Sequence, residues 1–245
     1  MVYRQAMAIS RIWLDVPFGE KDEAKAHGAR WDPDARRWYA PRADMAGLAP
    51  WLARPDVPDL LPGEDRGFGP GLFVDLVPKS CWFTNVRSCV SERDWERLRR
   101  MITTRAGQRC EICGRPADRE AGRWLEAHER WAYDDATRTQ SLRRLICVCT
   151  DCHQVTHYGL ATIKGKGAEA MNHLRAVTRL SRDDAELLVE AAFEIWHQRS
   201  LTTWELDLSM LTEAGVTVRR PPAAADRARQ AERELRPGPG SAAPR

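Results

Sequence analysis

The stretch CTDCHQVTH, residues 149–157, places two cysteines and two histidines within nine positions. Cys149 and Cys152 have the two-residue gap that is typical of a zinc-binding pair, and a second such pair, Cys110 and Cys113, lies upstream. Two turns of this kind supply four thiolates, which is a donor set that tetrahedral zinc prefers. We therefore expect one structural Zn²⁺ ion held by these four cysteines.

Two histidines of the same stretch remain once the cysteines bind zinc. If residues 153–157 are helical, the spacing of four places His153 and His157 on one helical face. A single finger of two cysteines and two histidines would need about a dozen residues between the pairs, and here the pairs abut. The sequence therefore favours a second metal site, for which His128 in LEAHERW is the third ligand. His173 and His197 lie in predicted helices, and we expect them to stay outside the site.

The composition indicates a folded protein that is not embedded in a membrane. The chain has 245 residues, a net charge of +3, 43% hydrophobic residues and ten tryptophans, which is enough apolar surface for a core. No apolar run approaches the roughly 20 residues that cross a bilayer, and the start lacks a signal pattern. We expect a cytoplasmic protein, in which the seven cysteines are ligands or buried thiols rather than disulfides. The cysteines not assigned to zinc are Cys81, Cys89 and Cys147.

The N-terminal segment reads as a small module. Residues 12–16 alternate as a strand does, residues 20–27 form a short helix, and RWDPDARRWYAP, residues 30–41, looks like a hairpin. This predicts a β-α-β-β unit that occupies residues 1–49. Residues 11–41 resemble a small bacterial domain of unknown function that is found in mobile-DNA proteins. The aromatic residues serve either as core and peptide-binding residues or as base-stacking residues, so a protein or a nucleic-acid partner is expected; they are Trp13, Trp31, Trp38 and Tyr39.

The rest of the chain divides into a linker, a central domain and a tail. Residues 50–71 are rich in Pro, Gly and Asp and are expected to be a linker. Residues 72–220 form the metal-binding domain with helices on its flanks, and LFVDLVP, residues 72–78, begins it as a strand. Ser91 is the expected cap of a helix that follows. Residues 221–245 are expected to be a disordered tail.

Three segments of the central domain together resemble the HNH endonuclease family, also called ββα-metal or His-Me finger nucleases. They are CEICG, LEAHERWAYDD and LRRLICVCTDCHQVTHYGLA, and the resemblance extends over about residues 72–212. It implies an α+β fold in which a zinc-braced hairpin packs on a helix. It also implies that His128, His153 and His157 hold a catalytic divalent cation, either Mg²⁺, Mn²⁺, Ni²⁺ or Zn²⁺, which polarises a DNA phosphodiester.

This sequence departs from the usual wording of the family at two positions. Glu129 stands where the histidine that activates water is usual, so the resemblance assigns it the role of general base beside His128. Arg144 stands where a central asparagine is usual. Glu126 is a second candidate carboxylate. Substrate contacts are expected from four basic residues, which are Arg143, Arg144, Lys164 and Lys166.

Three functional hypotheses follow. The first is a metal-dependent HNH-type endonuclease that hydrolyses DNA phosphodiester bonds. The second is a catalytically impaired, zinc-containing protein of HNH origin that binds nucleic acid. In the third, the histidine-bound metal serves another chemistry, or both metal sites are structural.

Overall fold

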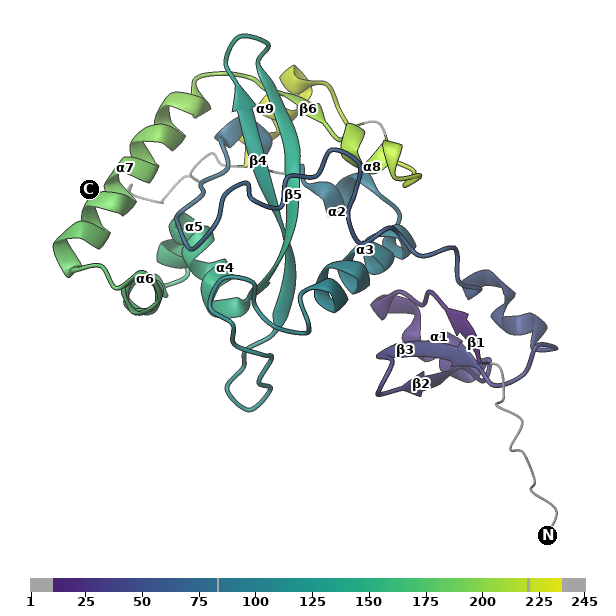
Figure 1. Cartoon of the computed structure of the whole chain (residues 1–245). Helices are drawn as coiled ribbons and strands as arrows, with labels where there is room; N and C mark the ends of the chain where they lie inside the picture. The colour runs from purple at the N-terminus through teal and green to yellow at the C-terminus, as the bar shows by residue number, and fades with distance from the viewer. Residues whose placement is uncertain (1–10, 83, 220, 235–245) are drawn as a thin grey trace.

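The computed structural model describes residues 11–82, 84–219 and 221–234, and it confirms an α+β fold (Figure 1). The first part of the chain has the predicted β-α-β-β order. Its elements are β1 (Ile12–Leu14), the 3-10 turn η1 (Phe18–Glu20), α1 (Lys21–Ala26), β2 (Arg30–Asp32), β3 (Arg37–Ala40) and the 3-10 turn η2 (Ala46–Trp51).

The N-terminal unit is a three-stranded antiparallel sheet of order β1-β3-β2, covered on one face by α1 and η2. Leu14 and Ala40 of the sheet pack with Leu48 and Trp51 of η2, and all four are buried. The unit continues beyond the predicted boundary at residue 49, because the Ala53 amide donates a hydrogen bond to the Trp13 carbonyl at 3.0 Å.

The larger part of the molecule is built on a long hairpin. Its elements are the 3-10 turn η3 (Lys79–Cys81), α2 (Val86–Cys89), α3 (Glu92–Arg105), β4 (Leu125–Asp134), β5 (Thr139–Cys149), α4 (Thr150–Thr156), α5 (Tyr158–Ile163), α6 (Gly167–Thr178), α7 (Arg182–Ser200), β6 (Glu205–Asp207), α8 (Ser209–Glu213) and α9 (Ala224–Glu234). β4 and β5 pair antiparallel along their length, and β6 joins β5 in parallel. The predicted cap is present, since the Ser91 side chain accepts from the Asp94 amide.

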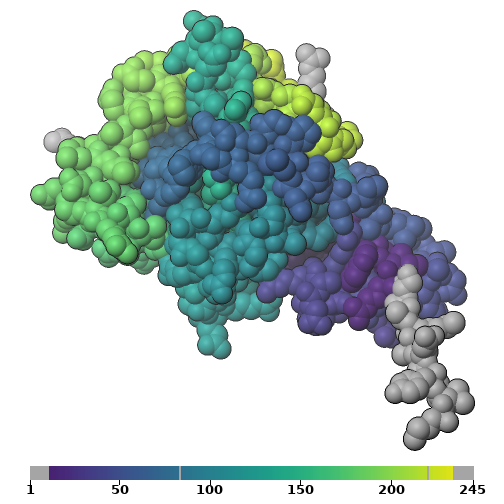
Figure 2. All heavy atoms as spheres, viewed as in Figure 1, coloured from purple at the N-terminus to yellow at the C-terminus, as the bar shows by residue number. Residues whose placement is uncertain are grey.

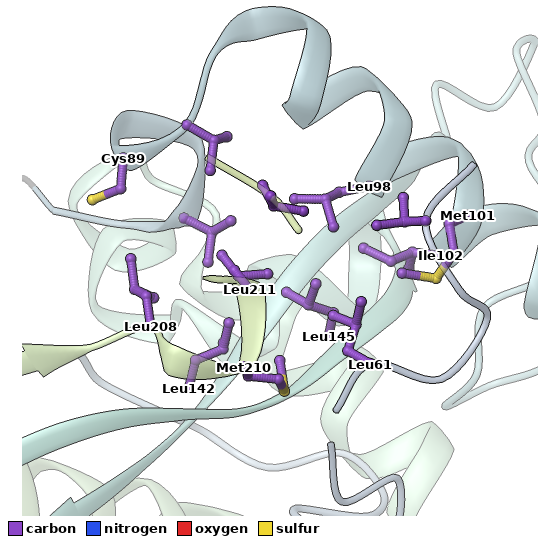
Figure 3. Close-up of a cluster of buried hydrophobic side chains, with 14 of the residues drawn as sticks. Leu61, Cys89, Leu98, Met101, Ile102, Leu142, Leu145, Leu208, Met210 and Leu211 are labelled. Carbon is purple, nitrogen blue, oxygen red and sulfur yellow. The ribbon is translucent and has the colours of Figure 1, made fainter. Parts of the chain in front are cut away.

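The hairpin separates two hydrophobic cores. On one side Leu142 and Leu145 of β5 pack with α3 and α8 (Figure 3). On the other side Ile146 and Val148 pack with α4, α6 and α7, which lie across the hairpin from α3 in Figure 1. Successive strand residues point to opposite faces, so β5 supplies both cores. Its burial on both sides explains the nearly continuous apolar run from Leu145 to Cys149.

The predicted linker is instead a strap that packs on the hairpin; we use this name for residues 54–78. Val57 and Leu61 are buried in the core beside α3, and the Asp65 amide donates to the Arg143 carbonyl at 2.9 Å. In the space-filling view the blue surface of this stretch crosses the teal hairpin region (Figure 2). The strap does lack helices and strands, and the strand expected at residues 72–78 does not form. Its extended backbone is tied to α4 by an Asp75 to Thr156 hydrogen bond of 3.0 Å rather than by a ladder.

The tail predicted to be disordered from residue 221 is also partly ordered. Residues 224–234 form α9, which packs against η3. Ala224 and Ala231 are buried, and the Arg227 guanidinium donates to the Trp204 carbonyl. The Pro, Ala and Arg composition suggested disorder, but a narrow alanine stripe is enough to dock this helix. Residues 235–245 lie outside the described residues.

A buried ion pair holds the strap to α3, and the same carboxylate contacts the hairpin. Arg105 of α3 contacts both carboxylate oxygens of Glu64, at 2.7 and 2.6 Å, and both side chains are almost fully buried. Glu64 also accepts from the Leu145 and Leu61 amides at 3.0 and 3.2 Å. Burial opposes ionisation of Glu64, but these donors outweigh it and lower the pKa of the carboxyl. Three of these four hydrogen bonds, two from Arg105 and one from Leu145, come from outside the strap and fasten it at its middle.

Replacing Glu64 with alanine should strongly destabilise the protein. The substitution leaves Arg105 buried without its partner, which costs about 3–5 kcal/mol. Urea unfolding at a fixed zinc concentration measures the change. Glu186→Ala is the matched control, because its pair with Arg182 is exposed; removing it should change stability by at most about 0.5 kcal/mol. Equal effects of the two substitutions would show that the strap is not fastened in this way.

Candidate metal centres

The four predicted zinc ligands converge at the start of α4. Cys149 ends β5 and is the N-cap of the helix, and Cys152 lies in its first turn. Cys110 and Cys113 come from the loop after α3, and the four sulfurs lie within 4.8 Å of one another. The Cys113 and Cys149 sulfurs are 3.6 Å apart, close to the separation of two thiolates on one tetrahedral zinc. This donor set fits zinc as the sequence predicts.

The loop that carries the first pair is shaped by its backbone. The Gly114 amide donates to the Cys110 carbonyl at 2.9 Å, and Gly114 has φ +73°, a left-handed conformation that glycine adopts without strain. The Glu111 amide donates to the Cys147 carbonyl at 2.8 Å, which ties the loop to β5. Cys147 is buried on the other face of the strand and is absent from the sulfur cluster, as expected from its spacing.

The structure corrects the sequence prediction for His173. Its Nε2 lies 3.2 Å from the Cys152 sulfur, so α6 brings an imidazole directly to the zinc ligands. Arg115 lies beside it, with Nη2 at 3.0 Å from His173 Nδ1 and 2.9 Å from the Asp151 carboxylate. Four thiolates around Zn²⁺ carry a net charge of −2, and nearby donors offset it. His197, by contrast, is exposed on α7.

The three remaining predicted ligands form a separate cluster. His128 comes from β4, His153 from α4, and His157 follows as the C-cap of that helix. One ring nitrogen from each histidine can be chosen so that all three lie within 4.8 Å of one another. The centroids of the three rings are 5.2, 5.0 and 4.6 Å apart. The predicted pairing of His153 and His157 on one helical face is therefore present, and His128 reaches them from the hairpin.

Two imidazoles of the cluster are held neutral by burial, and the cluster is open on one side. Burial lowers the pKa of His128 well below its ordinary value, and the neighbouring His157 and His153 lower it further. Burial, followed by His153, lowers the pKa of His157 to about 4. Neutral imidazoles are the form that binds a metal ion. His128 is only 5% exposed, whereas the His153 side chain is 28% exposed, so an ion held here would face solvent from the His153 side.

The two candidate carboxylates lie in different environments. Glu126 Oε2 is 3.1 Å from His153 Nδ1, and this hydrogen bond is the main cause of the lowered Glu126 pKa. It leaves Nε2 of His153 free as a ligand atom. Glu129 is buried and accepts from the Val86 amide at 3.0 Å, at the start of α2. Burial raises its pKa. Glu126, not Glu129, contacts the imidazole cluster.

Of the four basic residues predicted to contact the substrate, three are exposed and one is buried. Arg143, Lys164 and Lys166 are exposed. Arg144 is buried and pairs with Glu111 at 2.8 Å, and its Nη1 donates to the Phe68 carbonyl at 3.3 Å. This arginine braces the strap and the zinc loop, so it is not available to a phosphate in this conformation.

Comparisons with known proteins bear on the first part of the chain. Residues 11–53 match the family described as a domain of unknown function (DUF5710), which confirms the resemblance of that segment. A DNA primase TraC of Escherichia coli is 48% identical over 62 residues, which is 25% of this chain and 5% of that protein. A second DNA primase TraC of Escherichia coli is 48% identical over 48 residues, 19% of this chain and 3% of that protein. The chain thus spans a small fraction of these relatives. No solved structure matches.

No helix among the described residues has the length and apolarity needed to cross a membrane.

Cys110→Ser should abolish tight zinc binding and unfold the central part of the protein, because a zinc–thiolate site contributes folding free energy directly. Metal analysis after gel filtration and circular dichroism measure the two effects. Cys147→Ala is the matched control, since this buried cysteine lies outside the sulfur cluster; it should keep its zinc. Retention of zinc and of thermal stability by Cys110→Ser would contradict the assignment of the four-cysteine site.

Proposed function

We propose that this chain is a metal-dependent endonuclease of the HNH type that hydrolyses DNA phosphodiester bonds. The proposal rests on one observation above all, the convergence of His128, His153 and His157 from a hairpin strand and the helix that follows it. Three histidine ligands with one open side are typical of catalytic rather than structural metal sites. The arrangement is also the one that the HNH resemblance implies.

A bound divalent cation would supply Lewis-acid polarisation of the phosphate and stabilise the charge on the leaving oxygen. The chain's own residues supply position. His128 is fixed by burial, and His153 is oriented by its hydrogen bond to Glu126. Exposed Arg143, Lys164 and Lys166 are proposed to contact the DNA backbone, as non-specific phosphate contacts do.

We assign the general base to Glu126 in place of Glu129. A base must first be within reach of the attacking water, and only then does its pKa matter. Glu126 adjoins the cluster, and its side chain is 37% exposed, so it can reach a water on the open side. Its lowered pKa keeps Glu126 in the ionised form that accepts a proton, and it also makes Glu126 a weaker base than an unperturbed carboxylate. Glu129 is occupied by the Val86 amide.

Similarity of the N-terminal segment to other proteins, rather than the imidazole cluster itself, supports DNA as the substrate. The relatives with similar segments are named DNA primases, and the first segment resembles a domain of mobile-DNA proteins. A second candidate function is DNA binding without cleavage. It is favoured by the fact that the two positions at which the family usually has its base and its asparagine, Glu129 and Arg144, both make structural contacts here.

The purified chain should nick supercoiled plasmid in the presence of Mg²⁺, Mn²⁺ or Ni²⁺, and His153→Ala should not. The substitution removes one of three metal ligands, so the rate should fall by at least about a hundredfold. Agarose gel electrophoresis, which follows the conversion of supercoiled plasmid to the open-circular form, measures the rate. His197→Ala is the matched control, because this exposed histidine lies on α7 outside both metal centres.

The outcomes separate the two candidate functions. Nicking by the parent chain and by His197→Ala, but not by His153→Ala, supports the endonuclease. Salt-dependent binding of DNA without cleavage under any of the three metals would support the second candidate and reject the first.

Glu126→Gln should reduce the nicking rate by about 10²–10⁴-fold, the usual contribution of a general base. Glu129→Gln keeps an acceptor for the Val86 amide and should change the rate by less than about tenfold on the same scale. Single-turnover plasmid assays on the two zinc-loaded variants measure this difference. The reverse ranking would return the base to Glu129, where the family resemblance places it.

A further inference from the structure

The N-terminal sheet has a second face, opposite α1 and η2, and α3 contacts it only where Arg100 pairs with Asp15. Cross-strand partners share a face, and Tyr39 of β3 is paired with Trp13 of β1 and with Arg30 of β2. Leu14 and Ala40 lie on the opposite face, under α1 and η2. We call this second side the outer face; it carries Arg11, Trp13, Arg30, Arg37 and Tyr39.

Aromatic rings and guanidinium groups alternate on the outer face. The Trp13 and Tyr39 rings are in edge-to-face contact at 6.3 Å. The Arg11 guanidinium lies 5.2 Å from the Tyr39 ring, and that of Arg37 lies 5.6 Å from the Trp13 ring. Both rings are half-buried, so each keeps some surface exposed. Rings flanked by arginines can bind unpaired bases by stacking while the cations contact phosphates.

The outer face carries three arginines and two aspartates of the module. The carboxylates on the outer face, Asp15 and Asp32, are buried and paired with Arg37 and Arg11, and Arg37 also pairs with the exposed Asp56 of the strap at 3.5 Å. Arg30 is exposed and makes no ion pair with any residue of the described ranges. The covered side carries charges of both signs on η1 and α1; they are Glu20, Lys21, Asp22, Glu23 and Lys25. The outer face therefore offers a polyanion the unpaired Arg30 guanidinium and the half-exposed Arg11 beside it.

The outer face is also joined to the metal-binding part of the chain. Asp15 pairs with Arg37 at 3.2 Å and with Arg100 of α3 at 3.0 Å. Arg54, at the start of the strap, pairs with Asp94 of α3 at 3.3 Å. Figure 1 shows the module beside α3. A ligand on the outer face would be held at a defined position relative to the hairpin, which raises its effective concentration there.

We propose that the outer face of the N-terminal sheet binds single-stranded nucleic acid, with bases stacked on Trp13 and Tyr39 and phosphates contacted by Arg30 and Arg11. Stacking requires unpaired bases, which excludes a continuous duplex as the preferred ligand. An acidic or apolar peptide would leave either the rings or the arginines without partners. This site is distinct from the imidazole cluster, and it does not depend on nuclease activity.

The test measures binding of a fluorescent oligothymidylate of about 15 nucleotides, roughly one site size, to the full zinc-loaded chain without added divalent cation. Arg30→Glu should weaken binding about tenfold or more, and it should reduce the slope of log affinity against log salt by about 0.7 for each phosphate that the variant no longer neutralises. Lys25→Glu is the matched control, because it makes the same change of charge on α1 of the covered side. It should change the affinity less than about twofold, since screening weakens its distant field.

Tyr39→Leu tests the stacking contribution separately from charge. It should also weaken binding about tenfold, with no change in the salt slope, because one base no longer stacks on an aromatic ring while all cations stay. Thermal melting shows whether each variant remains folded; if Tyr39→Leu unfolds the module, Tyr39→Phe, which keeps the ring, should bind as the parent does.

Three results would overturn the inference. The first is the absence of oligothymidylate binding by the parent at low salt, and the second is equal weakening by Arg30→Glu and Lys25→Glu. The third is tighter binding of a duplex of the same length. None of these results depends on cleavage, so failure here leaves the proposed endonuclease standing, and failure of the nicking assay leaves this site standing.

Discussion

The arrangement of both metal centres depends on one seven-residue helix, α4. Cys152 and His153 are neighbours in it, and consecutive helical residues point about 100° apart, so the thiolate and the imidazole face different sides. A helix of this length is not stable alone in water. Its N-terminus is held by Cys149 and Cys152, and its C-terminus leads into His157. Zinc at the thiolates would thus stabilise the helix that positions two of the three imidazoles.

A second constraint keeps the hairpin against this helix. Glu111, in the loop between the first two cysteines, accepts from the Cys147 amide at 2.9 Å and pairs with Arg144 of the same strand. Glu64 of the strap accepts from the Leu145 amide. Two buried or nearly buried carboxylates therefore fasten the zinc loop and the strap to neighbouring residues of β5. Breaking such contacts is costly because a buried charge is left unpaired, so the strand is held firmly where the zinc loop meets it.

Local patterns predicted the local features well. The Cys-x-x-Cys spacing, the four-residue gap between His153 and His157 and the β-α-β-β order of the first segment all appear in the structure. The failures concern tertiary contacts. His173 was expected to stay outside the metal sites, and only the packing of α6 on α4 brings it to Cys152. The strap looked like a linker because it has no period, yet two apolar side chains and one carboxylate suffice to dock it; they are Val57, Leu61 and Glu64.

Strand geometry explains why Glu126, and not Glu129, lies beside the imidazoles. His128 and Glu126 are two residues apart on a regular ladder, so their side chains share a face, whereas Glu129 points to the other core. The irregularity of the ladder comes between Arg130 and Trp131, one residue too late to turn Glu129 toward the imidazoles. A family position transfers a role only if the backbone there has the same conformation. In this chain the strand pairing is regular through residue 130, so the carboxylate that contacts His153 is that of Glu126.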